Sequence, residues 1–205
     1  ESPVAVFVDT LSNKVKKFPM LHPHGEITFK NYNSYIADLS YSNIMKDSFF
    51  IYSFALDENL YKTNIQTGII EKILAKSRYI SNVNPIKLPS ELTQLMKKTC
   101  EMPSYGNIMY DKYRKVYYRF VYLKSELKPN EDSRKILHNG KKEFSIMMLD
   151  ENFKVLGETR FPAFTYVPHI CFINKDGLYL STNHFKREDY SDDVLRFQRI
   201  ELVKK

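Results

Sequence analysis

The stretch FSIMMLDENFKVLGETRF, residues 144–161, decides the fold of this chain. Its apolar run 144–149 is followed by a polar turn at 150–152 and by a second run that ends at Phe161. Asp150 closes the first run, because an Asp side chain can bond the backbone two residues further on and start a turn. The stretch therefore predicts two antiparallel strands joined by a short turn.

The same strand-turn-strand unit occurs twice more. It spans residues 4–18, where Asp9 closes the first strand, and residues 59–74, where Asn64 does so. Further apolar runs lie between the units, and the final strand is expected at 195–203. Counted in order, the strands predict sheets of two, four, four and three strands, in repeats at roughly 1–18, 35–80, 104–161 and 168–203.

The apolar pattern predicts an all-β fold of stacked sheets. Residues 49–52 and 116–118 are apolar on both alternations, as expected when both faces of a sheet are covered. We therefore expect one propeller-like domain over 1–205, a stack of four-stranded antiparallel blades. About three and a quarter blades cannot close a ring, so the domain is expected to belong to a longer chain. An open or sandwich-like all-β fold is the alternative.

Two insertions interrupt the strands. Residues 89–98 predict one short helix, capped by Ser90, with Leu92, Leu95 and Met96 on a common face. Residues 124–142 are polar and are expected to form an exposed loop. The last sheet lacks its outer strand, and an open edge of this kind invites association with a partner.

Charge, hydropathy and cysteine content narrow the range of partners and cellular compartments expected for the protein. Net charge is +7, but the basic pairs are scattered among acidic residues, so no nucleic-acid partner is expected. No run is long enough for a transmembrane helix. The chain begins at Glu1 and not at Met, as expected of a processed protein; any signal peptide or lipid anchor upstream would lie outside this sequence. Cys100 and Cys171 have no metal-binding spacing; a disulfide between them is conceivable, and a buried thiol is expected at Cys171.

Several strand segments resemble a family of uncharacterised lipoproteins of Bacteroides-type bacteria, a propeller-like domain of unknown function. The segments are 49–61, 77–80, 144–153, 157–159, 169–173, 177–181 and 183–184. The resemblance covers most of this chain but only about the C-terminal half of a typical member. It implies export to the periplasm or the outer-membrane surface, and it implies no catalytic residues.

Arg119 and Tyr118 are the first candidate ligand-binding residues. Arg119 lies in the apolar run 117–122, and a buried guanidinium needs an anionic partner. A carboxylate on a neighbouring strand is one such partner, and a substrate carboxylate or phosphate is the other. Tyr118 offers a large amphipathic contact surface beside it.

Three histidines complete the candidate set. His22 and His24 are close enough to share a metal with Glu26, but they supply only two of the usual three or four ligands, so no metal or cofactor is predicted. His184 ends a strand and opens the polar stretch 186–193. It is either a ligand contact or general base, or part of a surface loop without a partner.

No glycine-rich phosphate loop, serine elbow, zinc signature or dinucleotide fingerprint occurs in the chain. The function expected from the sequence is therefore a non-catalytic binding or scaffold module of an exported bacterial envelope protein, which recognises a glycan or a protein. The alternative is a propeller hydrolase or lyase with a site in the central channel that uses Arg119 and a histidine.

Overall fold

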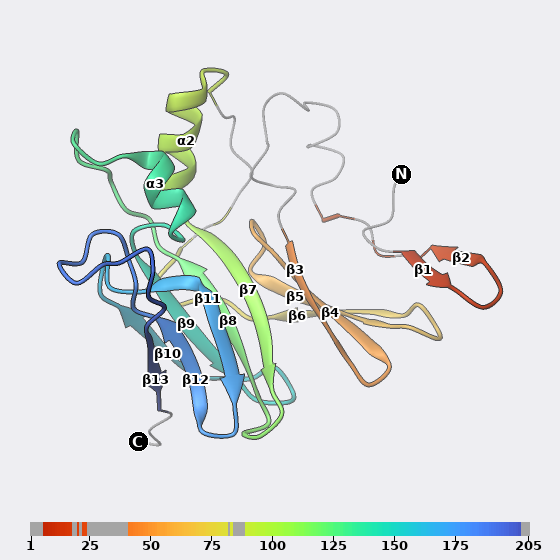
Figure 1. The fold of residues 1–205 in the computed structure, drawn as a ribbon. Helices are drawn as coiled ribbons and strands as arrows, with labels where there is room; N and C mark the ends of the chain where they lie inside the picture. The colour runs from red at the N-terminus through yellow and green to blue at the C-terminus, as the bar shows by residue number, and fades with distance from the viewer. Residues whose placement is uncertain are drawn as a thin grey trace.

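The structure, a computed structural model, describes residues 6–17, 20, 22–23, 41–81, 83 and 89–201. Across these ranges the chain is all-β apart from two short helices (Figure 1). The strands are β1 (Val6–Asp9), β2 (Lys14–Lys17), β3 (Tyr41–Lys46), β4 (Phe49–Phe54), β5 (Asn59–Asn64), β6 (Ile70–Leu74), β7 (Ser104–Asp111), β8 (Val116–Tyr122), β9 (Phe144–Leu149), β10 (Val155–Phe161), β11 (Val167–Asn174), β12 (Gly177–Ser181) and β13 (Phe197–Ile200). The helices are α2 (Leu92–Glu101) and α3 (Ser133–His138).

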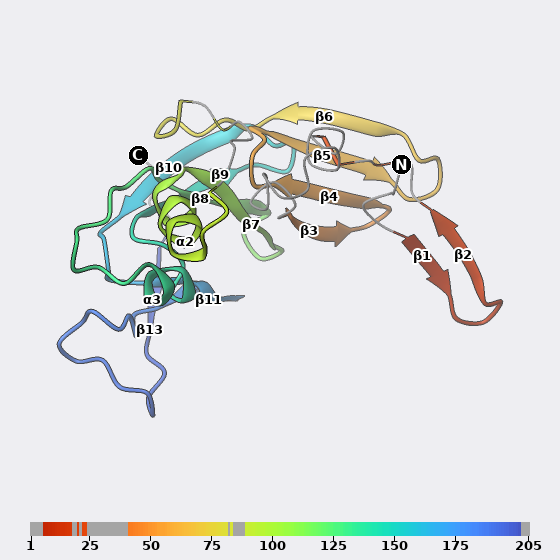
Figure 2. The ribbon, with the colours of Figure 1, turned by 90° about the horizontal axis from the view of Figure 1, so that it is seen from above.

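The strands form antiparallel sheets in which each strand pairs with the next one along the chain. Two sheets have four strands, β3 to β6 and β7 to β10, a third contains β11 to β13, and β1 pairs with β2 alone. These sizes agree with the two, four, four and three expected from the sequence. The β1–β2 hairpin stands apart from the other sheets (Figures 1 and 2).

Side-chain acceptors close the turns between paired strands. The Asn64 carboxamide accepts from the backbone N–H groups of Gln66 and Thr67, and Asp150 accepts from Asn152 and Lys154. This confirms the turn chemistry expected at these two positions. The same arrangement recurs at two hairpins outside the three repeated units recognised in the sequence. Asp111 accepts in this way after β7, and Asn174 after β11.

The β7–β10 sheet is the centre of the packing, because both of its faces are buried. One face packs with Ile51 and Leu60 of the β3–β6 sheet, and the opposite face packs with Leu178 and Leu180 of the third sheet. Side chains of β8 go alternately to the two sides: those of Tyr117 and Val121 to the first core, and those of Val116, Tyr118 and Phe120 to the second. The apolar character of β8 on both alternations is thereby explained.

The helices differ from the sequence-based expectation in two respects. α2 forms, but it starts and ends three residues later than the predicted 89–98, and Glu91 and not Ser90 caps it by accepting from the backbone N–H groups of Thr93 and Gln94. The segment expected as an exposed loop contains α3, whose first turn is capped by Asp132. This helix forms because Ile136, fully buried, packs against α2. Neither described helix is long and apolar enough to cross a membrane.

Both cysteines are free thiols. The Cys100 thiol is buried under α3 and donates to the Ser133 carbonyl at 3.2 Å, whereas Cys171 is partly buried beside Met109. Burial raises the pKa of each thiol to about 11, so both are protonated and unreactive at neutral pH.

A buried carboxylate ties the segment after β6 to the outer strands of the central sheet. Glu158 on β10 accepts from the Ser77 and Ser145 hydroxyls, each at 2.6 Å, and from the Arg78 backbone N–H at 2.9 Å. Its side chain therefore joins the segment after β6 to β9 and β10 through three hydrogen bonds to a charged acceptor.

We expect Glu158→Ala to lower the free energy of unfolding by about 2–4 kcal/mol, because it leaves two buried hydroxyls and one N–H without their acceptor. Urea unfolding followed by fluorescence measures the change. Glu188→Ala, at an exposed position, is the control and should stay within about 0.5 kcal/mol of the wild type. Equal losses in the two variants would contradict a structural role for Glu158.

Candidate functional site

Arg119 lies on β8, fully buried between the central sheet and the β3–β6 sheet. Its Nε donates to the Ser53 hydroxyl at 3.0 Å. Nη1 donates to the carbonyls of Glu58 and Ala75 at 2.9 and 2.8 Å, and Nη2 to those of Asp57 and Asn59 at 2.7 and 3.3 Å. The guanidinium also lies 3.6 Å from the ring centre of Tyr105, a cation–π contact.

Through these contacts Arg119 links the central sheet to the β3–β6 sheet. The partner expected from the sequence was a carboxylate, but backbone carbonyls of the β4–β5 and β6 segments take that place. Burial lowers the pKa of Arg119 to about 10, which still leaves it a cation at neutral pH. All five of its N–H groups are donated internally, so none remains for a substrate.

Tyr118 points away from Arg119, into the apolar core between the central sheet and the β11–β13 sheet. Its hydroxyl donates to Asp111 at 3.2 Å, and Arg114 forms an ion pair with the same carboxylate at 2.9 Å. Burial is the largest cause that raises the pKa of Tyr118 above its ordinary value. With 2% of its surface exposed, Tyr118 offers no contact surface to a ligand in this structure.

His22 lies beside the β3–β6 sheet, where its ring meets the Phe54 ring edge-on with ring centres 4.8 Å apart. His24 and Glu26, the other members of the proposed histidine site, lie outside the described residues. Within the described ranges, no three His, Cys, Asp or Glu side chains come together as a metal site would require.

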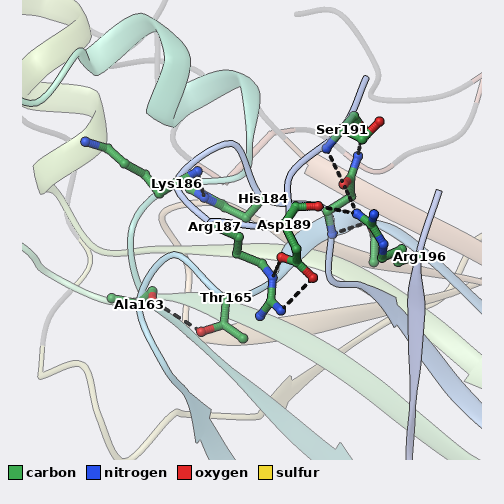
Figure 3. Close-up of polar contacts among 10 residues, drawn as sticks. Ala163, Thr165, His184, Lys186, Arg187, Asp189, Ser191 and Arg196 are labelled. Atoms are coloured by element: carbon green, nitrogen blue, oxygen red, sulfur yellow. Dashed lines mark hydrogen bonds and ion pairs between the residues drawn. The ribbon is translucent and has the colours of Figure 1, made fainter. Parts of the chain in front are cut away.

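His184 is held in the loop that joins β12 to β13 (Figure 3). It is fully buried, and its ring packs against Phe185 and Phe164 with ring centres 4.8 and 5.4 Å away. Its Nδ1 accepts from the Lys186 backbone N–H at 3.2 Å, which places the proton of the neutral ring on Nε2. Among the described residues, Nε2 has no hydrogen-bond partner. Burial, assisted by Lys186, lowers the pKa of His184 to about 4.

The rest of this loop is tied to itself by polar contacts. Arg187 forms two bonds to the Asp189 carboxylate at 2.8 and 3.2 Å, and Arg196 donates to the Asn183 side chain and to the Asp189 carbonyl. Asn183 in turn donates to the Ser191 carbonyl at 2.7 Å. Figure 3 shows Lys186 extending away from this network, whereas Arg187 and Arg196 point into it. The loop is therefore ordered locally around a neutral histidine.

Next to this loop, the outer face of the third sheet carries a row of exposed aromatic side chains. Phe172 on β11 stacks on Tyr179 of β12 with ring centres 4.8 Å apart, and Phe197 of β13 meets Phe172 at 5.0 Å. Phe172 is 41% exposed and Phe197 37% exposed. We call Ile170, Phe172, Tyr179 and Phe197 the aromatic face.

Sequence reasoning did not single out the aromatic face. The signal was present, because in β11 and β12 the residues between those of the face, such as Cys171, Ile173, Leu178 and Leu180, are also apolar and pack inward. A strand that is apolar on both alternations is expected to have two covered faces. Here one of the two faces is open.

The predicted candidates are thus not brought together. Arg119 faces the β3–β6 sheet, Tyr118 faces the β11–β13 sheet, and His184 lies in the loop after β12. An enzyme site that combines Arg119 with His184 needs convergent side chains, and the described geometry does not bring these two together; His24 lies outside the described residues.

Fold and site together define an all-β protein of packed antiparallel sheets with one open aromatic face. The chain belongs to the family described as "Domain of unknown function (DUF4221)", whose family model matches residues 1–160.

A solved structure of a DUF4221 family member from Bacteroides vulgatus ATCC 8482 is similar to this chain. The two share 28% sequence identity with a TM-score of 0.74, over 95% of this chain and 55% of that protein. This chain therefore spans little more than half the length of that relative. No curated protein matches the sequence.

We expect Arg119→Met to lower the free energy of unfolding by more than about 3 kcal/mol, since four backbone carbonyls and the Ser53 hydroxyl lose their donor. Arg119→Lys should recover only part of this loss, because an ammonium has three donors and not five. The measurement is urea unfolding at pH 7. Arg160→Met, which removes an exposed ion pair with Glu143, is the control and should cost about 0–1 kcal/mol. A cost at Arg119 no larger than at Arg160 would disprove the connecting role.

The lowered pKa of His184 makes stability depend on pH. The unfolded chain takes up a proton near pH 6.5 that the folded chain takes up only near pH 4, so stability is complete above pH 6.5 and falls between these values. In His184→Phe this contribution is absent. On going from pH 7.5 to 5, the variant should lose about 1–2 kcal/mol less than the wild type, as measured by urea unfolding at both pH values. Parallel losses would show that His184 titrates normally.

Proposed function

We propose that the chain is a propeller-like portion of an exported envelope protein and acts there as a binding or scaffold module. The order of strands supports the propeller arrangement. In all three larger sheets the strands follow one another in sequence, and the first strand of the central sheet, β7, lies next to β3 and β11, the first strands of its two neighbours. First strands that lie side by side, with later strands further out, are the arrangement of blades around an axis.

The observation that carries the binding role is the aromatic face of the third sheet. The central sheet has both faces covered, whereas the third sheet has an inner face that packs on the central sheet and an outer face that exposes Phe172 and Phe197. Counting only the described residues, it also has three strands where the two preceding sheets have four. Both the open face and the missing fourth strand are features of a surface that another β-structure completes.

The chemistry of the aromatic face favours a protein over a glycan. Phe172, Phe197 and Ile170 provide apolar area but no hydrogen-bonding group, and Tyr179 provides one hydroxyl. Arg199, the cross-strand partner of Tyr179, lies on the same side of the sheet, but its guanidinium is already paired with Glu201. Sugar recognition needs several free donors and acceptors beside the aromatic ring, whereas sheet-on-sheet packing needs an apolar face. We therefore propose that the partner is polypeptide: a further sheet, from the rest of a longer protein or from another envelope protein.

Two further features belong to the proposal. Export to the periplasm or the outer-membrane surface, with a lipid anchor upstream, follows from the family resemblance given above. A longer natural protein is supported by the Bacteroides relative, of which this chain covers 55%.

The test is self-association of the chain, since an open apolar face and strand edge should pair with a second copy when no other partner is present. We expect light scattering to show a concentration-dependent dimer or larger species, and Phe172→Ser with Phe197→Ser to restore the monomer. Tyr113→Ser, at an exposed aromatic on the β7–β8 turn, is the matched control and should associate like the wild type.

A monodisperse wild-type monomer up to about 100 μM would contradict the proposed face, because a dissociation constant weaker than that is below what a specific interface gives. A thermal-shift screen with neutral oligosaccharides distinguishes the alternative. A rise of several degrees that disappears in the Phe172→Ser, Phe197→Ser variant would replace the protein partner by a glycan.

A further inference from the structure

A serine and a lysine meet where α2 ends and β7 begins, at the opposite end of the central sheet from its hairpin turns (Figure 1). Lys141 follows α3 and Gly140, and its Nζ reaches across to donate to the Ser104 hydroxyl at 3.0 Å and to the Met102 carbonyl at 3.0 Å. Gly140 and Lys141 both have positive φ, 85° and 66°, so the backbone turns sharply here and directs the side chain inward.

The surroundings of the amine are unusual for a lysine. No described carboxylate forms an ion pair with Lys141, and both of its acceptors are neutral. An ammonium has three donors, and beyond the two acceptors its third N–H would meet only the Tyr122 ring, whose centre is 5.5 Å from Nζ, whereas a neutral amine has two N–H groups and a lone pair. Two partners, one of which is a hydroxyl that can itself donate, match the neutral amine.

The electrostatics of the site agree with this match. Burial lowers the pKa of Lys141 to about 8, opposed only by Cys100 on α2. The other titratable side chain at the site is Tyr122 on β8, whose ring centre lies 5.5 Å from Nζ. Burial raises the pKa of Tyr122 to about 12 and that of Cys100 to about 11, so both stay neutral where Lys141 loses its proton.

Ser104 is the second half of the arrangement. The residue is 8% exposed, and within the described ranges its hydroxyl hydrogen-bonds only Lys141. A hydroxyl within hydrogen-bond reach of a base, with that base oriented by a third group, is the arrangement of an activated nucleophile, and Ser–Lys pairs are one of its known forms. Here the third group is the Met102 carbonyl.

We propose that Ser104 and Lys141 form a nucleophile–base pair that reacts with small carboxylic esters, an activity beyond the proposed binding role and independent of it. Ser104 Oγ forms a bond to the acyl carbon while its proton passes to Lys141 Nζ. The bond from that carbon to the alcohol oxygen then breaks, and the alcohol leaves with the proton from Nζ. Water, deprotonated by the same amine, releases the acid and restores the hydroxyl.

The competing explanation is structural, because Lys141 also caps the C-terminal end of α2, where a cation is favourable. The two explanations predict different reactivity. A capping lysine affects only stability, whereas a base makes Ser104 react with electrophiles at a rate that follows deprotonation of the amine.

The test uses methanesulfonyl fluoride, a small reagent that loses fluoride and transfers its sulfonyl group to an activated serine hydroxyl. The folded chain is treated between pH 6 and 10 and mapped by peptide mass spectrometry. We expect the adduct on Ser104, at a rate that rises through a midpoint near pH 8 and then levels off. Ser125, equally buried but without a lysine partner, should stay unmodified and serves as the internal control.

Variants separate the base from the cap. Lys141→Met should slow modification of Ser104 about 100-fold or more. Lys141→Arg keeps a cation that can donate to Met102 but cannot act as a base at these pH values, and should be equally slow while retaining more of the thermal stability. Lys142→Met, which breaks the adjacent ion pair with Glu131, should react like the wild type.

Two results would overturn the proposal: no adduct on Ser104 in the folded wild type at any of these pH values, or a Lys141→Arg variant that reacts as fast as the wild type. Both outcomes are independent of whether the aromatic face binds a partner, so the dyad and the proposed binding role are tested separately.

Discussion

The structure depends on one buried cation. Arg119 comes from the middle of the most buried strand and gives all of its donors to the neighbouring sheet, four of them to backbone carbonyls at an apolar interface. Because the acceptors are backbone atoms, the bonds specify the path of the chain after β4 and β6, whatever side chains stand there. The arginine thus fixes the register of one sheet against the other, which apolar contacts by themselves do loosely.

The strand pattern was predictable because it depends on local chemistry. Asn64 and Asp150 each bond the backbone two residues on, and this short-range rule marks the hairpins regardless of how the sheets pack. The helix α3 was not predictable in the same way. Its six residues have no apolar stripe long enough to stand out, and it exists because Ile136 packs beside Cys100 on a helix more than thirty residues earlier. Tertiary contacts override local preference in such short elements.

For the candidate site residues, too, local features were predictable from the sequence and tertiary contacts were not. Arg119 was recognisable as exceptional from its apolar neighbours, but its acceptors are carbonyls, and carbonyls carry no sequence signal. His184 was recognisable as the residue that ends a strand, yet its burial between two phenylalanine rings depends on the loop that contains Phe164. The pairing of Ser104 with Lys141 joins residues 37 positions apart through a positive-φ turn, and neither residue belongs to a motif. Alternation does predict the aromatic face, but not that it is open.

The hairpin turns closed by their own Asn or Asp side chains have a consequence for how the chain folds. Each turn brings together residues that are close in sequence, so the contacts of every hairpin can form within microseconds and without waiting for distant segments. The buried bonds between sheets span some sixty residues and must form later. The chain is therefore best regarded as a series of quick local units whose slow step is docking one sheet on another.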